Sequence, residues 1–174
     1  DPSRRIEARL HLLLQRFATG IAPLDRLVGG KLTLDGGLAR LATGGFAFQN
    51  LIARGAYLDA RLDGQIDLKQ ALVDVTAAVS DLHRFDGRLT GRADLTAKIT
   101  GSLEKPDASA LVTIPQGTAL GRPIRDLKLT VLAKDVAAAP QADVTLAGDI
   151  GGKPAKGGLK LSRADGALRI ENLD

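Results

Sequence analysis

Polar and apolar residues alternate strictly through the middle of the chain, over residues 88–100. Leu89, Leu95 and Ile99 fall on one parity, and the charged and hydroxyl-bearing residues fall on the other. Because successive side chains of a strand point to opposite faces, this stretch predicts one β-strand with an apolar face and a polar face.

Residues 101–107 (GSLEKPD) interrupt the alternation with turn-forming residues, and residues 108–114 resume it. Pro106 has no N–H group to give to a central strand, so the first strand is expected to end near Lys105. The two stretches together predict a long hairpin-like unit with one solvent-exposed, polar face.

The same alternation predicts further strands along most of the chain, separated by glycine pairs and other turn residues. The expected strands cover residues 4–14, 31–35, 38–43, 46–52, 56–68, 71–79, 126–133, 142–146, 156–162 and 167–173, with turns at Gly36-Gly37 and Gly44-Gly45. Counting the central unit, the pattern predicts about eleven or twelve strands and an all-β fold.

Two short segments depart from the strand pattern. Residues 22–28 predict one short helical turn, because a proline stands near its start, Leu24, Leu27 and Val28 follow helical spacing, and a glycine pair follows. Residues 81–87 (DLHRFDG) predict a turn or a short helical link.

The predicted apolar faces can be buried in more than one way. A β-sandwich or a closed barrel would bury them. An elongated, strongly curved, antiparallel-rich sheet is favoured instead, because the apolar face is almost entirely aliphatic and the strand–turn unit repeats. At a strand spacing of about 4.8 Å, such a trough is about 50 Å long. An apolar trough of that size is expected to hold lipid, close on itself or contact another protein.

Composition and charge narrow the expected partners. The chain is 44% hydrophobic but only 3% aromatic, and its net charge is +4. With few rings to stack bases and no basic cluster, nucleic-acid binding is not expected. The sequence contains no apolar run of the roughly 18 residues that a membrane-spanning helix needs, so no such helix is expected in this segment.

No pattern of catalytic or ligand-binding residues stands out. His83 lies near Asp81 and Asp86, but no nucleophile motif accompanies it. Asp59 and Asp63 share the polar parity of their strand without the spacing of a calcium loop. The glycine pairs separate short strands and do not open a helix, as a dinucleotide-binding loop does. No enzymatic activity, metal site or cofactor is therefore predicted.

Several stretches carry a family resemblance. These are IAPLDRLVGG (21–30), GRLTGRADLTAKI (87–99), TGSLEKPDASALVTI (100–114), IRDLKLTV (124–131) and GDIGGKPAKGGLKLS (148–162). Together they cover most of the chain and resemble the TamB and AsmA-like family, in which a G-x-L-x-x-P phrase follows an alternating strand.

The resemblance implies a β-taco fold with a hydrophobic groove in the periplasm, within a protein anchored in the inner membrane. It also implies an outer-membrane β-barrel partner of the TamA type, and roles in phospholipid passage and outer-membrane protein assembly. Residues 1–174 are accordingly expected to form a single segment of a longer, repetitive β-groove protein.

The first functional hypothesis is a groove that carries phospholipid acyl chains without making or breaking a bond. Its predicted lining residues are Leu89, Leu95, Ile99, Val112, Ile114, Leu127, Leu129, Val131, Val144 and Leu146. The alternative is a scaffold or chaperone whose sheet edge templates the strands of outer-membrane β-barrel proteins. A sugar- or ligand-binding domain is less favoured, because no convergent polar or aromatic groups are visible.

Overall fold

A single twelve-stranded sheet and two short helices make up the computed structural model, which describes residues 6–42, 44–67, 69–102, 105–135, 141–164 and 167–173. The elements are β1 (Ile6–Gln15), α1 (Ala22–Val28), β2 (Lys31–Arg40), β3 (Phe46–Arg54), β4 (Leu58–Ile66), β5 (Ala71–Val79), α2 (Leu82–Phe85), β6 (Leu89–Gly91), β7 (Ala93–Gly101), β8 (Pro106–Ala119), β9 (Arg122–Lys134), β10 (Gln141–Ile150), β11 (Lys153–Ala164) and β12 (Ala167–Leu173).

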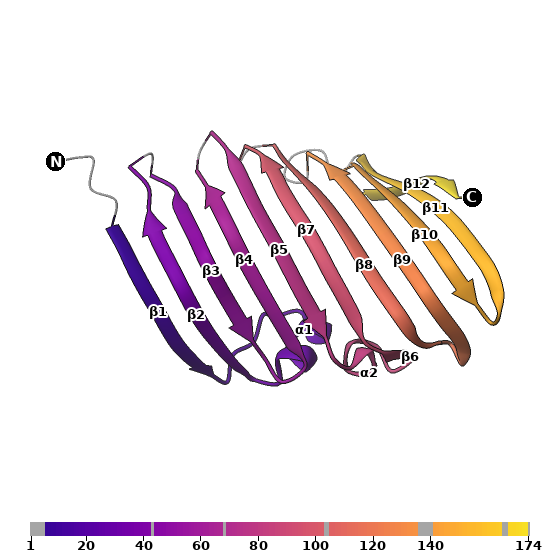
Figure 1. Cartoon of the computed structure of the whole chain (residues 1–174). Helices are drawn as coiled ribbons and strands as arrows, with labels where there is room; N and C mark the ends of the chain where they lie inside the picture. The colour runs from indigo at the N-terminus through magenta and orange to yellow at the C-terminus, as the bar shows by residue number, and fades with distance from the viewer. Residues whose placement is uncertain are drawn as a thin grey trace.

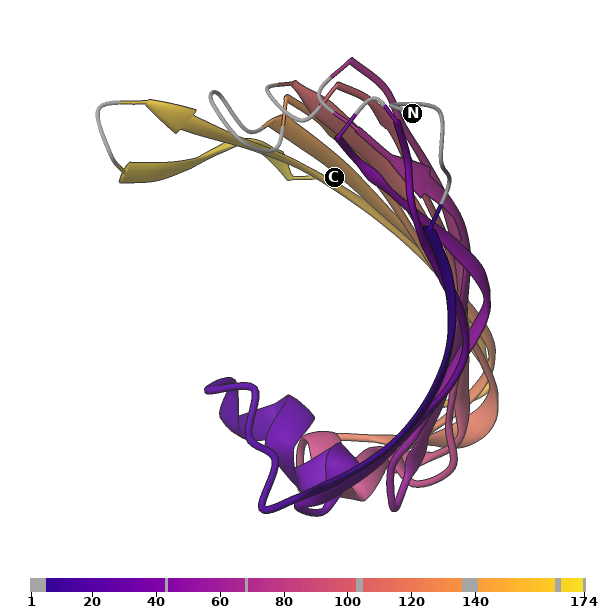
Figure 2. The same ribbon diagram turned by 90° about the vertical axis from the view of Figure 1, so that its left-hand side faces the viewer.

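Sheet order follows chain order from β1 to β12, except that β6 lies off this path and pairs with β8. Every pairing is antiparallel. Figure 1 shows the strands side by side, and Figure 2 shows that they curl into an open C-shaped trough. The prediction of a strongly curved antiparallel sheet is confirmed, and the sheet is not closed into a barrel.

Bulges contribute to the curl, because an extra residue in one strand bends it and increases its twist. The register shifts between β3 and both of its neighbours, where Asn50 has the left-handed φ of 49°. It shifts again between β9 and β10, close to Asp126, whose φ is 48°.

The turn predicted at Gly36-Gly37 is wrong, because β2 continues through both residues. Gly36 lies against the bulge of β3, where a Cβ atom would stand 2.6 Å from the carbonyl oxygen of Asn50 and 2.6 Å from the Cα of Leu51. The glycine therefore permits a close approach of two backbones and does not reverse the chain.

The single strand predicted over residues 88–100 is also wrong in one respect, because it is divided into β6 and β7. Gly91 ends β6 with a φ of 106°, which only glycine adopts readily. β6 then pairs with the far end of β8, whereas β7 lies between β5 and β8. β7 ends at Gly101, earlier than predicted.

Both predicted helical segments form. α1 has a proline at its start, and Gly29 ends it in the left-handed conformation with a φ of 68°. In α2 the side chain of Asp81 accepts a hydrogen bond from the backbone N–H of His83, which caps the first turn. In the part of the chain described here, neither helix is long and apolar enough to cross a membrane, which agrees with the sequence prediction.

The two helices lie inside the curl, at one end of the strands (Figure 2). Leu82 of α2 packs in a buried cluster with Ala93, Ile114 and Ile124 of the sheet. Leu27 and Val28 of α1 are also buried. The largest fully buried side chains, Leu27 and Ile124, therefore lie where the helices meet the sheet, whereas smaller buried residues such as Ala39, Ala71 and Val73 lie nearer the other end of the strands.

Shortening Ile124 is expected to test this core. Ile124 is 1% exposed, so Ile124→Ala leaves a cavity and should lower the free energy of unfolding by about 2–4 kcal/mol. Leu132→Ala is the matched control, because Leu132 lies on the same strand but is 53% exposed; it should cost about 0.5 kcal/mol or less. Urea denaturation measures both, and similar losses would contradict the assignment of the core.

Candidate functional site

Apolar side chains form three continuous rows that cross the strands on one face of the sheet. The first row contains Leu12, Leu34, Ala53, Ala60, Ala77, Leu95, Val112, Leu129 and Leu146. The second contains Leu51, Leu62, Val75, Ala97, Ala110, Val131, Val144 and Leu159. The third contains Phe48, Gly64, Val73, Ile99, Ala108, Ala133, Ala142 and Leu161.

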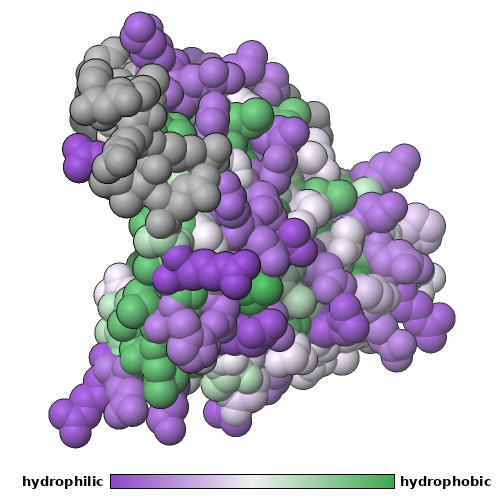
Figure 3. All heavy atoms as spheres, turned by 60° about the vertical axis from the view of Figure 1, so that its left-hand side comes forward, coloured by the Kyte–Doolittle hydropathy of each residue, from purple (hydrophilic) through white to green (hydrophobic). Residues whose placement is uncertain are grey.

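The three rows lie on the concave face. Leu82 of α2 contacts Ala93 and Ile114, which share the parity of the rows on β7 and β8. Because the helices sit inside the curl, this parity points inward (Figure 2). Charged residues occupy the other parity, and Figure 3 shows hydrophilic side chains over much of the outer surface, with hydrophobic ones gathered where the curl opens.

The concave face is open along its middle. Leu95, Val112, Leu129, Val131 and Leu146 are all only half-buried, in contrast to the side chains under the helices. Over the described residues, no second layer covers the three rows. The face is therefore an apolar groove that still contacts solvent.

Seven of the ten predicted lining residues lie in these rows. They are Leu95, Ile99, Val112, Leu129, Val131, Val144 and Leu146. The other three, Leu89, Ile114 and Leu127, belong to the core beside α2, where Ile114 is only 9% exposed. Ile114 is therefore covered by the protein itself.

The groove residues of the N-terminal half were not predicted from the sequence. Leu34, Leu51, Leu62 and Val75 extend the same rows across β2 to β5. The alternation of these strands was visible in the sequence. Phe48 and Leu51 are three residues apart and would face opposite sides of a regular strand. A bulge between them places both on the concave face, and this odd spacing of apolar residues is the sequence feature that could have indicated the bulge.

Hydrogen bonds to Asp63 fasten this bulge. The backbone N–H of Asn50 donates to Oδ1 of Asp63 over 2.7 Å, and Nε of Arg61 donates to Oδ2 over 2.9 Å. The hydrogen bond from Arg61, followed by that from Asn50, lowers the pKa of the Asp63 carboxyl below its ordinary value. The ionised carboxylate thus holds the register that aligns the rows.

Eight half-buried alanines form a diagonal lane across the groove. Ala53, Ala60 and Ala77 lie in the first row, Ala97 and Ala110 in the second, and Ala108, Ala133 and Ala142 in the third. Each group adjoins the next, so the lane runs from β3 to β10. The alanine side chains are shorter than those of the Leu, Val and Ile residues in the same rows, so we expect this lane to leave room for an occupant. A diagonal course also suits a straight ligand on a twisted sheet.

The concave face offers apolar contact rather than polar chemistry. Among the described residues, no buried side chain is polar or charged, and no group of three His, Cys, Asp or Glu residues could hold a metal ion. His11 contacts Asp35 on the outer parity, and His83 lies in α2.

Comparisons with known proteins found no matching family model, no matching curated protein and no matching solved structure. The resemblance to the TamB and AsmA-like family therefore depends on the sequence motifs alone.

Removing the carboxylate of Asp63 is expected to weaken the bulge. Asp63→Ala should lower the free energy of unfolding at neutral pH by about 1 kcal/mol or less, because solvent screens this half-exposed site. Since the folded pKa lies below the ordinary value of 3.8, the contribution of the ionised form is lost as the pH falls through the folded pKa.

The parent protein should therefore lose more stability than Asp63→Ala when the pH is lowered from about 5 to about 2. Thermal unfolding followed by circular dichroism measures this difference. Asp59→Ala on the same strand and face is the control, because no hydrogen bond or ion pair of Asp59 is seen among the described residues. An identical acid response in Asp63→Ala and the parent would contradict the role of Asp63.

Proposed function

We propose that this chain binds the acyl chains of phospholipids along its concave face and guides them between two membranes. One observation carries the proposal: three apolar rows cross the sheet without interruption by a charged residue, and most of their members, though not the buried Val73, remain partly exposed. Apolar area contacting water costs about 25 cal/mol per Å², so an apolar occupant would stabilise this face.

The dimensions of the groove suit an acyl chain. The three rows together cross ten strands of the main path, from β1 to β11, which gives a groove of about 43 Å at the usual strand spacing. One leaflet of a bilayer contributes about 15 Å of hydrocarbon, half of the core thickness. The groove is thus about three times as long as one acyl chain, and a lipid could move along it with its headgroup in solvent.

The cellular setting is part of the same proposal and is supported by the sequence motifs. In a TamB-like or AsmA-like protein, this chain would be a periplasmic segment of a longer groove anchored in the inner membrane. It would deliver lipid toward the outer membrane in cooperation with a TamA-like β-barrel partner. The open groove supports this assignment because it matches the fold that the resemblance implies.

An arginine placed inside the groove tests the proposal. Leu95 lies in the middle of the first row, so Leu95→Arg should reduce co-purifying phospholipid at least about fivefold, because a guanidinium is costly beside acyl chains. Thr96→Arg adds the same charge to the exposed outer face of the same strand and should leave the lipid content unchanged. Native mass spectrometry and lipid extraction measure both.

Circular dichroism establishes that both variants are folded. A parent protein that carries no lipid and takes up none from vesicles would sink the proposal. Equal lipid content in folded Leu95→Arg and Thr96→Arg would also count against it, because the bound lipid would then lie elsewhere.

The second candidate function, a scaffold for strands of outer-membrane proteins, is favoured by the contrast between the two sheet edges. β1 is an open edge of ten residues without proline or lysine. At the other edge, the half of β11 that β12 leaves unpaired contains Lys153, Pro154 and Lys156. Lysine and proline discourage strand addition, so β1 is the better template.

Proline substitutions distinguish this candidate. Of any two neighbouring residues in β1, one directs its N–H away from β2, so either Leu10→Pro or His11→Pro should block the pairing of an added strand. We expect that variant to lose binding of a labelled, alternating apolar–polar peptide at least about tenfold in fluorescence polarisation, while its lipid content stays unchanged. Peptide binding that both folded variants retain would rule out β1 as the template.

A further inference from the structure

One long margin of the trough differs in charge from the rest of the molecule. This margin, called the helical lip here, consists of the connections at the α1 and α2 end of the strands, residues 16–31, 55–58, 80–93, 120–122 and 151–153. It contains eight Arg and Lys residues but only three Asp residues, whereas the whole chain has 24 basic and 20 acidic residues. These residues carry a net charge of +5, or +4 when Asp94, the ion-pair partner of Arg92 just beyond the range, is included, compared with +4 for the whole chain.

Several of these cations have no acidic partner in the described part of the chain. They are Arg16, which follows β1, and Lys31, Arg122 and Lys153, which are the first residues of β2, β9 and β11. They are spread along almost the full width of the sheet. At the opposite ends of the strands, the described connections and the terminal strand residues carry Arg40, Lys69, Lys105 and Lys134 against Asp67 and Asp135, which is a smaller positive excess than that of the helical lip.

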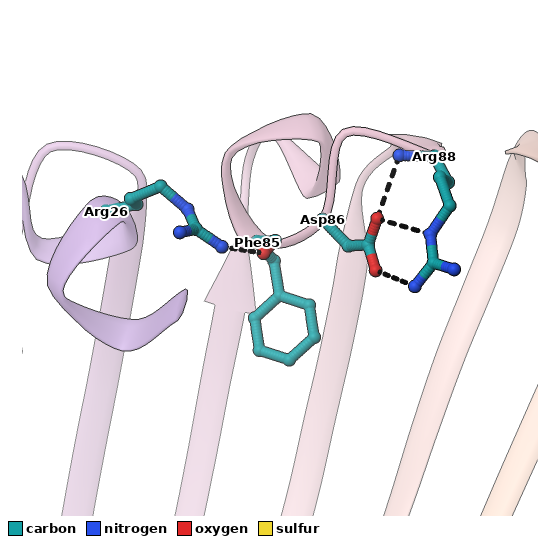
Figure 4. A network of polar contacts seen from close by, with 4 residues as sticks. All are labelled: Arg26, Phe85, Asp86 and Arg88. Carbon is teal, nitrogen blue, oxygen red and sulfur yellow. Dashed lines mark hydrogen bonds and ion pairs between the residues drawn. The ribbon is translucent and has the colours of Figure 1, made fainter. Parts of the chain in front are cut away.

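The remaining cations of the helical lip are held by other contacts: Arg84 pairs with Asp81 and Arg92 with Asp94, and Figure 4 shows the contacts of Arg26 and Arg88. Arg26 of α1 reaches α2, where its Nε donates to the carbonyl of Arg84 over 2.8 Å and its Nη2 donates to the carbonyl of Phe85 over 2.7 Å. Arg88 donates to both carboxylate oxygens of Asp86 and holds the pKa of that carboxyl well below its usual range. The contacts of Arg26 thus join α1 to α2, and those of Arg88 fix the link that follows α2.

Large apolar side chains project from the same lip. Leu120 is 74% exposed, Ile21 is 54% exposed and Phe85 is 39% exposed. They come from three separate places: the β8–β9 turn, the residue before α1 and the last residue of α2. Each is an isolated protrusion, not part of one flat patch.

Leu120 is also held in an unfavourable backbone conformation. It has a φ of 50°, followed by Gly121 at 76°, in the tight turn between β8 and β9. The corresponding turn between β10 and β11 uses Gly151 and Gly152, with φ values of 66° and 79°. Leucine seldom adopts such angles, and its exposed side chain gains no packing in return. The turn would fold better without it, so the residue points to a role outside folding.

We infer that the helical lip is a docking surface for an anionic lipid bilayer. Unpaired cations beside an anionic leaflet contribute favourable electrostatic energy, and isolated apolar tips insert at the boundary between headgroups and acyl chains. A protein partner fits less well, because the apolar tips are dispersed and do not form the continuous central patch of a stable protein interface.

This docking surface is distinct from the groove, and it does not depend on the groove holding lipid. It would place the long opening of the trough beside the bilayer surface. The two proposals can fail separately, because substitutions on the helical lip leave the three apolar rows intact, and Leu95→Arg leaves the lip intact.

Flotation of the purified chain with vesicles tests the inference. Binding to vesicles of phosphatidylglycerol and phosphatidylcholine should exceed binding to pure phosphatidylcholine and weaken as salt is added. A lip variant, Arg16→Gln, Lys31→Gln, Arg122→Gln and Lys153→Gln combined, should reduce the partition coefficient at least about tenfold. The control combines Arg9→Gln, Lys128→Gln, Lys134→Gln and Lys156→Gln, which gives the same net charge; it should reduce the coefficient less than about twofold.

Leu120→Asn provides an independent readout of insertion. Asparagine tolerates the positive φ of this turn, so the variant should be at least as stable as the parent in thermal unfolding. It should nevertheless bind the anionic vesicles about fivefold more weakly, because the apolar tip is gone.

Three results would overturn the inference. The first is equal binding to neutral and anionic vesicles. The second is an equal loss of binding in the lip and control variants, which would mean that net charge alone matters. The third is the absence of vesicle binding by the parent protein. If the parent then binds soluble polyglutamate and the lip variant does not, the helical lip binds an acidic protein partner instead of a bilayer.

Discussion

A β-sheet has two faces, and an apolar face is fully removed from water only where a second layer covers it. In this chain α1 and α2 supply that layer at one end of the strands alone, where Leu82 meets Ala93 and Ile124. The middle of the concave face has no such cover among the described residues. The groove and the contrast between its two margins both follow from this incomplete second layer.

Curvature compensates for part of the missing layer. Curling brings inward-facing side chains of the same strand closer together and reduces their contact with water, while the outer side chains spread apart. The bulge at Asn50 contributes to the curl without losing the apolar rows, because the extra residue restores the parity of Phe48 and Leu51. Asp63 fastens that bulge from the polar face, so an outer charge supports the inner surface.

The alternation of polar and apolar residues was enough to predict most strands, because strand periodicity depends only on neighbouring residues, and the aliphatic face and the repeated strand–turn unit favoured a curved sheet without deciding whether it is open or closed. The alternation was not enough at Gly36 and Gly91. The role of each glycine depends on a backbone from another strand, which no local pattern reveals. Seven predicted groove residues occupy the rows, but the cover that α2 gives to Ile114 was invisible, since it depends on how the helix folds back.

The groove and the helical lip offer a lipid two different kinds of contact, apolar in the groove and electrostatic on the lip. Inside the groove, the rows exclude charge, so an occupant gains from apolar contact and can slide without breaking a specific bond. On the lip, Arg26 and Arg88 are fixed by hydrogen bonds while Arg122 and Lys153 are unpaired, so the same margin is rigid and still attractive to anions. Lipid transfer needs both the apolar groove and the cationic lip, because a groove in which acyl chains can slide is useful only if its opening is held against the membrane from which the lipid enters.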